Sequence, residues 1–105
     1  MEVVHNAAQH RFELHPDGIE GQAGPDADVA FLVYDQRGGR MILVHTEVPA
    51  RFEGRGLGGM LVRAAVEYAR AQQLRVVPLC PFARAYLQRH PEYADRVTGA
   101  RSADT

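Results

Sequence analysis

Residues 45–59 read His-Thr-Glu-Val-Pro-Ala-Arg-Phe-Glu-Gly-Arg-Gly-Leu-Gly-Gly, and they join a predicted strand to a predicted helix. The segment 40–48 is rich in Val, Ile and Leu, whereas apolar residues recur at helical spacing in 60–72. Pro49 ends the strand because it lacks an N–H donor. Four glycines within six residues then lead into the helix, although each lowers helix propensity by about 1 kcal/mol relative to alanine. The stretch therefore predicts a strand–loop–helix unit whose loop has a special purpose.

A β-hairpin is predicted immediately before this unit. The segment 29–35 is as apolar as 40–48, and Gln-Arg-Gly-Gly at 36–39 separates the two. Gly-Gly tolerates the positive φ angles of a tight turn, so the two segments are expected to pair antiparallel. Further upstream, 3–6 and 11–15 form a predicted strand pair, and the Gly-, Pro- and Asp-rich segment 16–28 is a predicted loop with a short strand near Ile19.

The second half of the chain predicts a crossover. The segment 74–79 is a predicted buried strand, parallel to 40–48 by a right-handed crossover, and a helix over 82–89 begins after Pro81 and stops before Pro91. The order predicts an α+β fold, in which a mixed sheet forms an antiparallel meander completed by a β-α-β crossover and a C-terminal helix. We expect one domain over 1–97 and a flexible tail over 98–105. The buried stripe of the first helix is predicted to be Leu57, Leu61, Ala64, Ala65 and Tyr68, with Arg63, Glu67 and Arg70 mostly on the other side.

Composition narrows the class of partner. The chain has 105 residues and a formal net charge of -1, and its twelve basic residues, all Arg, alternate with acidic ones. This balance argues against a nucleic-acid partner. No apolar run approaches the roughly 18–20 residues of a membrane helix, and the first residues do not resemble a signal peptide. We expect a cytoplasmic protein without a membrane partner; the sequence leaves its oligomeric state open.

The glycine-rich loop predicts an anion site. Without side chains, the N–H groups at a helix N-terminus can approach a phosphate closely, and the helix dipole adds roughly half a positive charge there. Tight packing is the alternative reason for glycine, but four glycines fit it less well than one. The string Gly54-x-Gly56-x-x-Gly59 also matches the dinucleotide fingerprint. That reading is rejected because the loop does not turn directly off its strand, 75–79 has no acidic residue and the chain is too short for a doubly wound sheet.

The glycine-rich loop and two later stretches of the chain resemble a known protein family. The strand end 45–49 followed by 53–58 is similar to the acetyl-CoA loop of the GNAT superfamily, and the strings 78–82 and 89–93 resemble its small stand-alone members of about 100 residues. The resemblance covers 28–97 and implies acetyl-CoA or coenzyme A as the cofactor. It departs from the broad superfamily at Glu53, where Gln or Arg is usual, and at Leu87, where Tyr is usual. The implied cofactor-binding residues are Thr46 and Val48 for the pantetheine, Gly54, Arg55, Gly56, Leu57, Gly58 and Gly59 for the pyrophosphate, and Arg51, Arg55 and Arg84 for the nucleotide phosphates.

Candidate catalytic groups lie at the ends of two neighbouring strands. His45 and Cys80 are expected at the carboxyl ends of adjacent parallel strands, where open α/β crevices bind ligands. His45 could deprotonate Cys80 and give an acetyl-cysteine, or it could act as base on the amine while Cys80 or Tyr86 returns a proton. Glu47 is a second candidate base. Both residues also have structural interpretations: a small buried filler for Cys80 and a hydrogen-bonded strand residue for His45.

Two functions follow from these residues. The first is an acetyl-CoA-dependent N-acetyltransferase whose open acceptor site suits a protein or peptide amine. The alternative is a module that binds coenzyme A or acetyl-CoA with little or no turnover. An unrelated nucleotide-phosphate binder is a third possibility, weakened by Glu53 and the absence of Lys. No metal site is predicted, because His5, His10 and His15 recur every five residues and share no face of a helix or strand, and His90 is expected to cap the last helix without a chemical role.

Overall fold

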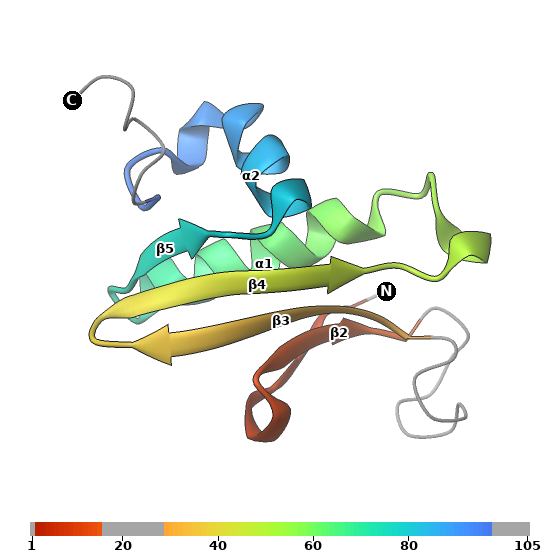
Figure 1. The fold of residues 1–105 in the computed structure, drawn as a ribbon, viewed down its shortest axis with the longest axis horizontal. Coiled ribbons are helices and arrows are strands. Elements are labelled where there is room, and N and C mark those ends of the chain that lie inside the picture. The colour runs from red at the N-terminus through yellow and green to blue at the C-terminus, as the bar shows by residue number, and fades with distance from the viewer. Residues whose placement is uncertain (1, 16–28, 98–105) are drawn as a thin grey trace.

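The computed structural model describes residues 2–15 and 29–97. It contains a five-stranded sheet in the order β1-β2-β3-β4-β5, antiparallel except for the parallel pair of β4 and β5 (Figure 1). The predicted α+β fold with a mixed sheet is confirmed, whereas the predicted strand near Ile19 and the tail over 98–105 lie outside the described residues. The elements are β1 (Val4–Asn6), β2 (Arg11–Leu14), β3 (Ala30–Arg37), β4 (Arg40–Glu47), α1 (Leu57–Ala71), β5 (Arg75–Pro78) and α2 (Pro81–Gln88), with short 3-10 helices η1 (Ala7–Gln9), η2 (Ala50–Phe52) and η3 (Pro91–Tyr93).

The predicted hairpin forms where the Gly-Gly pair requires it. Arg37 pairs with Arg40 at its closed end, and Gly38 and Gly39 have φ angles of 52° and 80°. Two successive positive φ angles suit the right-handed twist of the strands and favour glycine at both positions. The turn therefore fixes the register that brings β4 to the centre of the site.

The core lies between α1 and one face of the sheet. Figure 1 shows α1 behind β4 and β5. Each fully buried Leu or Val contributes about 1.5–3 kcal/mol relative to an exposed one. The buried side chains of α1 therefore hold this helix on the sheet. The fully buried side chains include Leu61, Val62 and Val66 of α1 and Leu14, Leu32, Met41 and Leu43 of the strands, while Ala64 and Tyr68 of the predicted stripe are only partly buried.

The outer edge of β5 is partly covered by the end of the described chain. The Val76 N–H donates to the Arg96 carbonyl at 2.9 Å, and Val97 forms a parallel bridge with Val76. Arg70 pairs with Asp95 at 3.0 Å. These contacts hold the segment after η3 against β5 and α1.

The face of the sheet opposite α1 carries a polar cluster on β1 and β2. Glu13 is buried, and it accepts hydrogen bonds from Asn6, Arg11 and His15. Burial alone would raise the pKa of Glu13, but the hydrogen bonds from Arg11, Asn6 and His15 hold that pKa below its usual value. The cluster therefore compensates the buried charge of Glu13 within the sheet, which is a structural role.

The three early histidines lie in different surroundings. His5 stacks on Phe12 at 4.4 Å between ring centroids, whereas His15 contacts Glu13 on the other face of the sheet. Within residues 2–15 and 29–97, no three His, Cys, Asp or Glu side chains gather in a way that could hold a metal ion. In the same ranges, no helix has the length and apolar character needed to cross a bilayer.

Candidate functional site

The strand before the glycine loop carries a bulge. The register of β3 and β4 passes from Tyr34↔Leu43 to Val33↔His45, so Val44 is the extra residue. Inward-facing positions consequently change phase along β4: Met41 and Leu43 face α1 before the bulge, and Thr46 does so after it. His45 and Thr46 therefore point to opposite faces of the sheet.

The parallel strands separate just after this point. Leu43↔Pro78 is the last pair of β4 and β5. The N–H groups of Leu79 and Cys80 both donate to the Leu43 carbonyl, each at 3.0 Å, which ends the ladder. β4 continues to Glu47 without a strand partner on the side of β5. An opening results between the last part of β4 and the start of α2.

The glycine loop reaches α1 through two left-handed residues. Gly54 and Gly56 have φ angles of 85° and 77°, a region that favours glycine. Gly56 is the N-cap of α1, and no side chain caps this end of the helix. The first turn of a helix has N–H groups without intrahelical partners, so the end of α1 presents donors toward the loop.

The next two glycines have a different cause. A Cβ on Gly58 would lie 2.6 Å from Cζ of Phe82, and one on Gly59 would lie 2.8 Å from Cε2 of Tyr86. Tight packing, the less favoured explanation from sequence, therefore accounts for Gly58 and Gly59, and the close neighbour is α2. Helix α1 begins at Leu57, earlier than the predicted start at 60, because these glycines belong to its first turn.

A cleft of about 350 Å³ lies beside the unpaired part of β4. A second groove of about 390 Å³ continues from it along α1 and α2, since the two share Gly56, Gly59 and Phe82. The cleft is lined by Thr46, Val48, Phe52, Glu53, Gly54, Gly56, Leu57, Gly58, Gly59 and Phe82. The groove is lined by Gly56, Gly59, Met60, Arg63, Phe82, Tyr86, Arg89 and His90.

The arginines are distributed differently from the prediction. The guanidinium groups of Arg51 and Arg55 lie 4.4 and 5.2 Å from the centroid of the Phe52 ring, beside the cleft. Arg84 lines neither cavity, and its Nε donates to the Pro78 carbonyl at 3.4 Å. The groove instead contains Arg63 and Arg89, which the sequence analysis did not select.

His90 is the third cation-forming residue of the groove. Its Nδ1 donates to the Tyr86 carbonyl at 2.7 Å, so it caps α2 as predicted. Its ring also stacks on Tyr86 with 3.9 Å between centroids. Because a carbonyl only accepts, the proton of the neutral ring lies on Nδ1. The sequence carries no signal that links Arg63 of α1 to Arg89 and His90 after α2, because only the packing of α1 on α2 brings them together.

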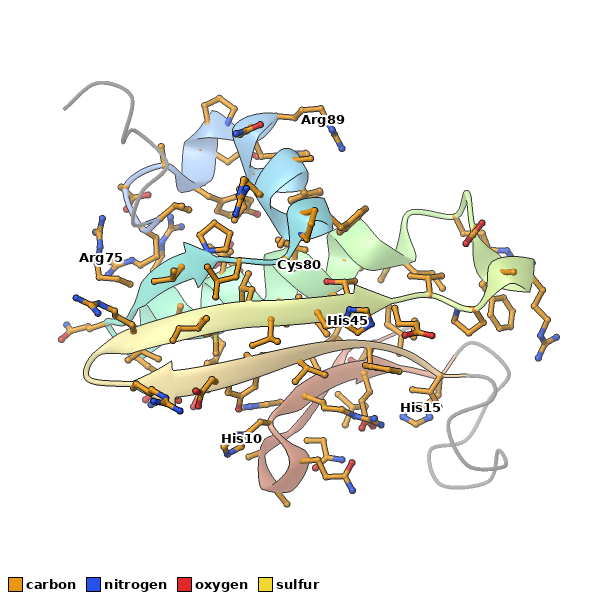
Figure 2. All side chains as sticks on the ribbon, in the orientation of Figure 1. His10, His15, His45, Arg75, Cys80 and Arg89 are labelled. Carbon is orange, nitrogen blue, oxygen red and sulfur yellow. The ribbon has the colours of Figure 1, made fainter. Side chains whose placement is uncertain are left out.

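The structure does not bring His45 and Cys80 into a hydrogen-bonded pair (Figure 2). The exposed His45 donates through Nε2 to Oε1 of Glu47 at 2.9 Å. Cys80 is 4% exposed, and its thiol donates to Oγ1 of Thr46 at 3.4 Å. The predicted carboxyl-end placement of both residues holds, but the bulge turns His45 to the far face. The predicted deprotonation of Cys80 by His45 therefore lacks the contact it needs in this structure.

Tyr86 lies in the groove, against Gly59 and His90, and not at the strand opening. Burial is the first cause that raises the pKa of Tyr86, and the neighbouring Tyr93 adds to it. A phenol with a raised pKa keeps its proton, which suits a donor. No contact links it to Cys80 or Thr46 in the residues that the structure describes.

A mixed sheet with a bulged central strand, a strand opening and a glycine-rich helix start defines a GNAT-like protein. The family model for the GCN5-related N-acetyl-transferase matches residues 11–96. The chain therefore belongs to the GCN5-related N-acetyltransferase family, as the resemblance of its loop predicted.

Known relatives agree with this assignment. The chain is 28% identical over 100 residues to Protein NATD1 of Mus musculus, which covers 92% of this chain and 84% of that protein. It is 26% identical to Protein NATD1 of Danio rerio, and that match covers 92% of this chain and 84% of that protein. A GCN5-like protein from Staphylococcus aureus, solved in solution by NMR, superposes with a TM-score of 0.70 at 25% identity and covers 93% of this chain and 88% of its own.

Proposed function

We propose that this chain binds acetyl-coenzyme A and transfers the acetyl group to an amine. The observation that carries the proposal is the continuity of the cleft: it runs from the unpaired edge of β4, past the uncapped start of α1, to the cationic groove between α1 and α2. An elongated ligand with an amide-bearing arm, a diphosphate and a further phosphate matches that order of groups. Membership of the family supports the same ligand.

Each part of the cleft has a binding role in this proposal. Thr46 and Val48 would pair through their backbone with the amides of the pantetheine arm, as an added strand pairs with a sheet edge. The amides of 55–59 would hold the diphosphate, and Arg51 and Arg55 lie beside that loop. Arg63, Arg89 and His90 would bind the remaining nucleotide phosphate, in place of Arg84.

The bound thioester would supply an activated acetyl group, and the residues at the strand opening would handle protons. His45 donates through Nε2 to Glu47, so its neutral form has a lone pair on Nδ1 that can take a proton from the incoming ammonium. Cys80 is buried behind Thr46, so it would return a proton to the departing thiolate through the Thr46 hydroxyl, which lines the cleft. Tyr86 is a weaker candidate for this role, because it lines the groove and not the strand opening.

Direct transfer is favoured over an acetyl-cysteine route. A nucleophilic thiol must be reached by its substrate and must lose its proton to a base. Cys80 is buried, and its contact is the neutral hydroxyl of Thr46. Intact mass after incubation with acetyl-CoA distinguishes the routes: an adduct of one acetyl group, absent in Cys80→Ala, would restore the covalent route.

A binding module with little turnover is the second candidate. The observation that favours it is the separation of His45 from Cys80 by the two faces of β4. The deciding experiment combines calorimetry with release of free thiol from acetyl-CoA in the presence of a panel of amines. Binding with amine-dependent thiol release supports the transferase, binding without it supports the module, and no heat of binding rejects both.

A further inference from the structure

The face of the sheet opposite α1 has an apolar patch at the strand opening. Val44 and Leu79 are 47% and 56% exposed, and exposed apolar side chains that adjoin one another can mark a binding surface. Ile42 pairs directly with Val77; Val44 lies two residues farther along β4, and Leu79 lies two residues after Val77, just past the end of β5. No helix of the described ranges crosses in front of β3 and β4 in Figure 1.

The patch lies across the opening from the cleft. The two N–H groups that converge on the Leu43 carbonyl end the pairing of β4 and β5 at this point. Thr46 and Cys80 meet on the inner side of the opening. Val44 and His45, the two residues of the bulge, are exposed on the outer side. A molecule that rests on the patch can therefore approach a thioester in the cleft from the other face of the sheet.

The charge on this face is concentrated at the same place. Glu13 is neutralised by Arg11, and Asp35 by Arg37. Glu47 has a different partner, His45, which is uncharged unless protonated. Among these three ion pairs, Glu47 is the carboxylate that is not paired with an arginine. It lies on the same strand as Val44 and His45. An ammonium group is the complementary charge.

We propose that Val44, Leu79, His45 and Glu47, here called the outer patch, bind the acceptor, and that the acceptor is a primary amine carried on an apolar chain. This inference rests on the proposed function and specifies its substrate. The ammonium lies at Glu47, the apolar chain covers Val44 and Leu79, and His45 receives the proton that the amine releases. A polyamine or a nucleotide fits less well, because a single carboxylate and aliphatic side chains form the surface. A second copy of the chain also fits less well, since a stable interface takes about 20–30 residues per partner and the outer patch is defined by four.

The test uses two amines of equal length, hexylamine and 2-(2-aminoethoxy)ethanol, which differ in the apolarity of the chain. Rates of thiol release from acetyl-CoA are compared as kcat/KM at one neutral pH, where both amines are almost entirely in the ammonium form that the outer patch is proposed to bind. We expect hexylamine to exceed the ether amine by about tenfold, the effect of burying one or two methylene groups. In Leu79→Ser and Val44→Ser this ratio should fall toward one, while the Kd for acetyl-CoA stays the same.

Phe82→Ser is the matched control, because Phe82 is also a large exposed apolar residue but lines the cleft. It should weaken acetyl-CoA binding and leave the amine ratio unchanged. An amine titration followed by the methyl NMR signals of Val44 and Leu79 gives a second readout that needs no turnover, with shifts expected for hexylamine.

Three results would overturn the outer patch as an acceptor site. The first is a kcat/KM ratio of the two amines that stays unchanged in both serine variants. The second is a set of methyl signals that does not respond to hexylamine. The third is sedimentation that shows a dimer, which Val44→Ser or Leu79→Ser dissociates. If acetyl-CoA fails to bind, the proposed function fails, and the methyl titration still decides whether the patch binds an apolar amine.

Discussion

The two faces of β4 differ in what they present, although they belong to the same few residues. Toward α1, Thr46 and Val48 line a cleft that ends in glycine amides and cationic side chains. Away from α1, His45 and Glu47 form an exposed pair beside aliphatic side chains. The one-residue bulge at Val44 produces this separation. The comparison teaches that one strand end can present two chemically different surfaces when its partner strand diverges.

The sharpest test of this division is His45→Gln. Loss of a general base typically lowers a rate by about 10²–10⁴-fold, so kcat for acetyl transfer should fall by at least about 10²-fold. The Kd for acetyl-CoA should stay within about twofold of the wild-type value, because His45 faces away from the cleft.

The matched control is His15→Gln. His15 also contacts a glutamate on the same face, but it lies on the far side of β3 from β4, next to Glu13. Its replacement should leave kcat unchanged in protein that remains folded. Equal losses in the two variants, or an unaffected His45→Gln, would remove His45 as the base.

A double-mutant cycle at Gly58 tests how the inner face is built. Gly58→Ala should lower the free energy of unfolding by about 1 kcal/mol, because the added Cβ overpacks against Phe82. In a Phe82→Leu background the same change should be neutral or stabilising, since alanine is the better helix former. Urea unfolding measures both steps, and the coupling between them should be about 1–2 kcal/mol. No coupling would mean that the ring does not require the glycine.

The cationic groove gives a smaller and more selective effect. Arg63→Ala and Arg89→Ala should each weaken acetyl-CoA binding by about tenfold, which corresponds to about 1.4 kcal/mol. Dephospho-coenzyme A, which lacks the 3′-phosphate, should bind both variants and the wild type alike. Arg84→Ala is the control, because Arg84 lies outside both cavities. An equal loss for both ligands in calorimetry would place the phosphate elsewhere.

His5, a partly buried histidine of β1, predicts a pH dependence of stability. Burial lowers the pKa of His5, which stacks on Phe12 inside the fold. Protonation then favours the unfolded chain, so the stability from neutral His5 is present above about pH 6.5 and is lost as pH falls toward the lowered pKa. Thermal unfolding between pH 7.5 and 5.5 should show a smaller decrease of Tm in His5→Gln than in the wild type.

The sequence predicted the fold well because its signals are local. Gly38 and Gly39 define the hairpin turn, and Pro81 starts α2 as expected. The loop from Pro49 led correctly to a helix, with its start misplaced by three residues. The segment named as helix began at 60, although Leu57 was already assigned to its buried stripe. Gly58 and Gly59 lie in the first turn, where they admit the rings of α2.

The candidate site was harder to predict because it depends on direction and on helix packing. A bulge changes the face of the sheet to which each later residue points. The residue types of Val44 and its neighbours do not indicate that a bulge occurs there. The predicted contact between His45 and Cys80 failed for this reason. Arg63 and Arg89 looked like solvent-exposed charges, since the sequence does not say where α2 lies on α1.

The most direct test is a titration with acetyl-CoA followed by the backbone amide NMR signals of the glycine loop. If the start of α1 holds the diphosphate, the amides of Gly56, Gly58 and Gly59 should shift together and saturate at one Kd, which calorimetry should reproduce. Residues of the outer patch should shift less when no amine is present. Unchanged glycine amides at saturating ligand, or the largest shifts around Glu13 on the opposite face, would contradict the assignment.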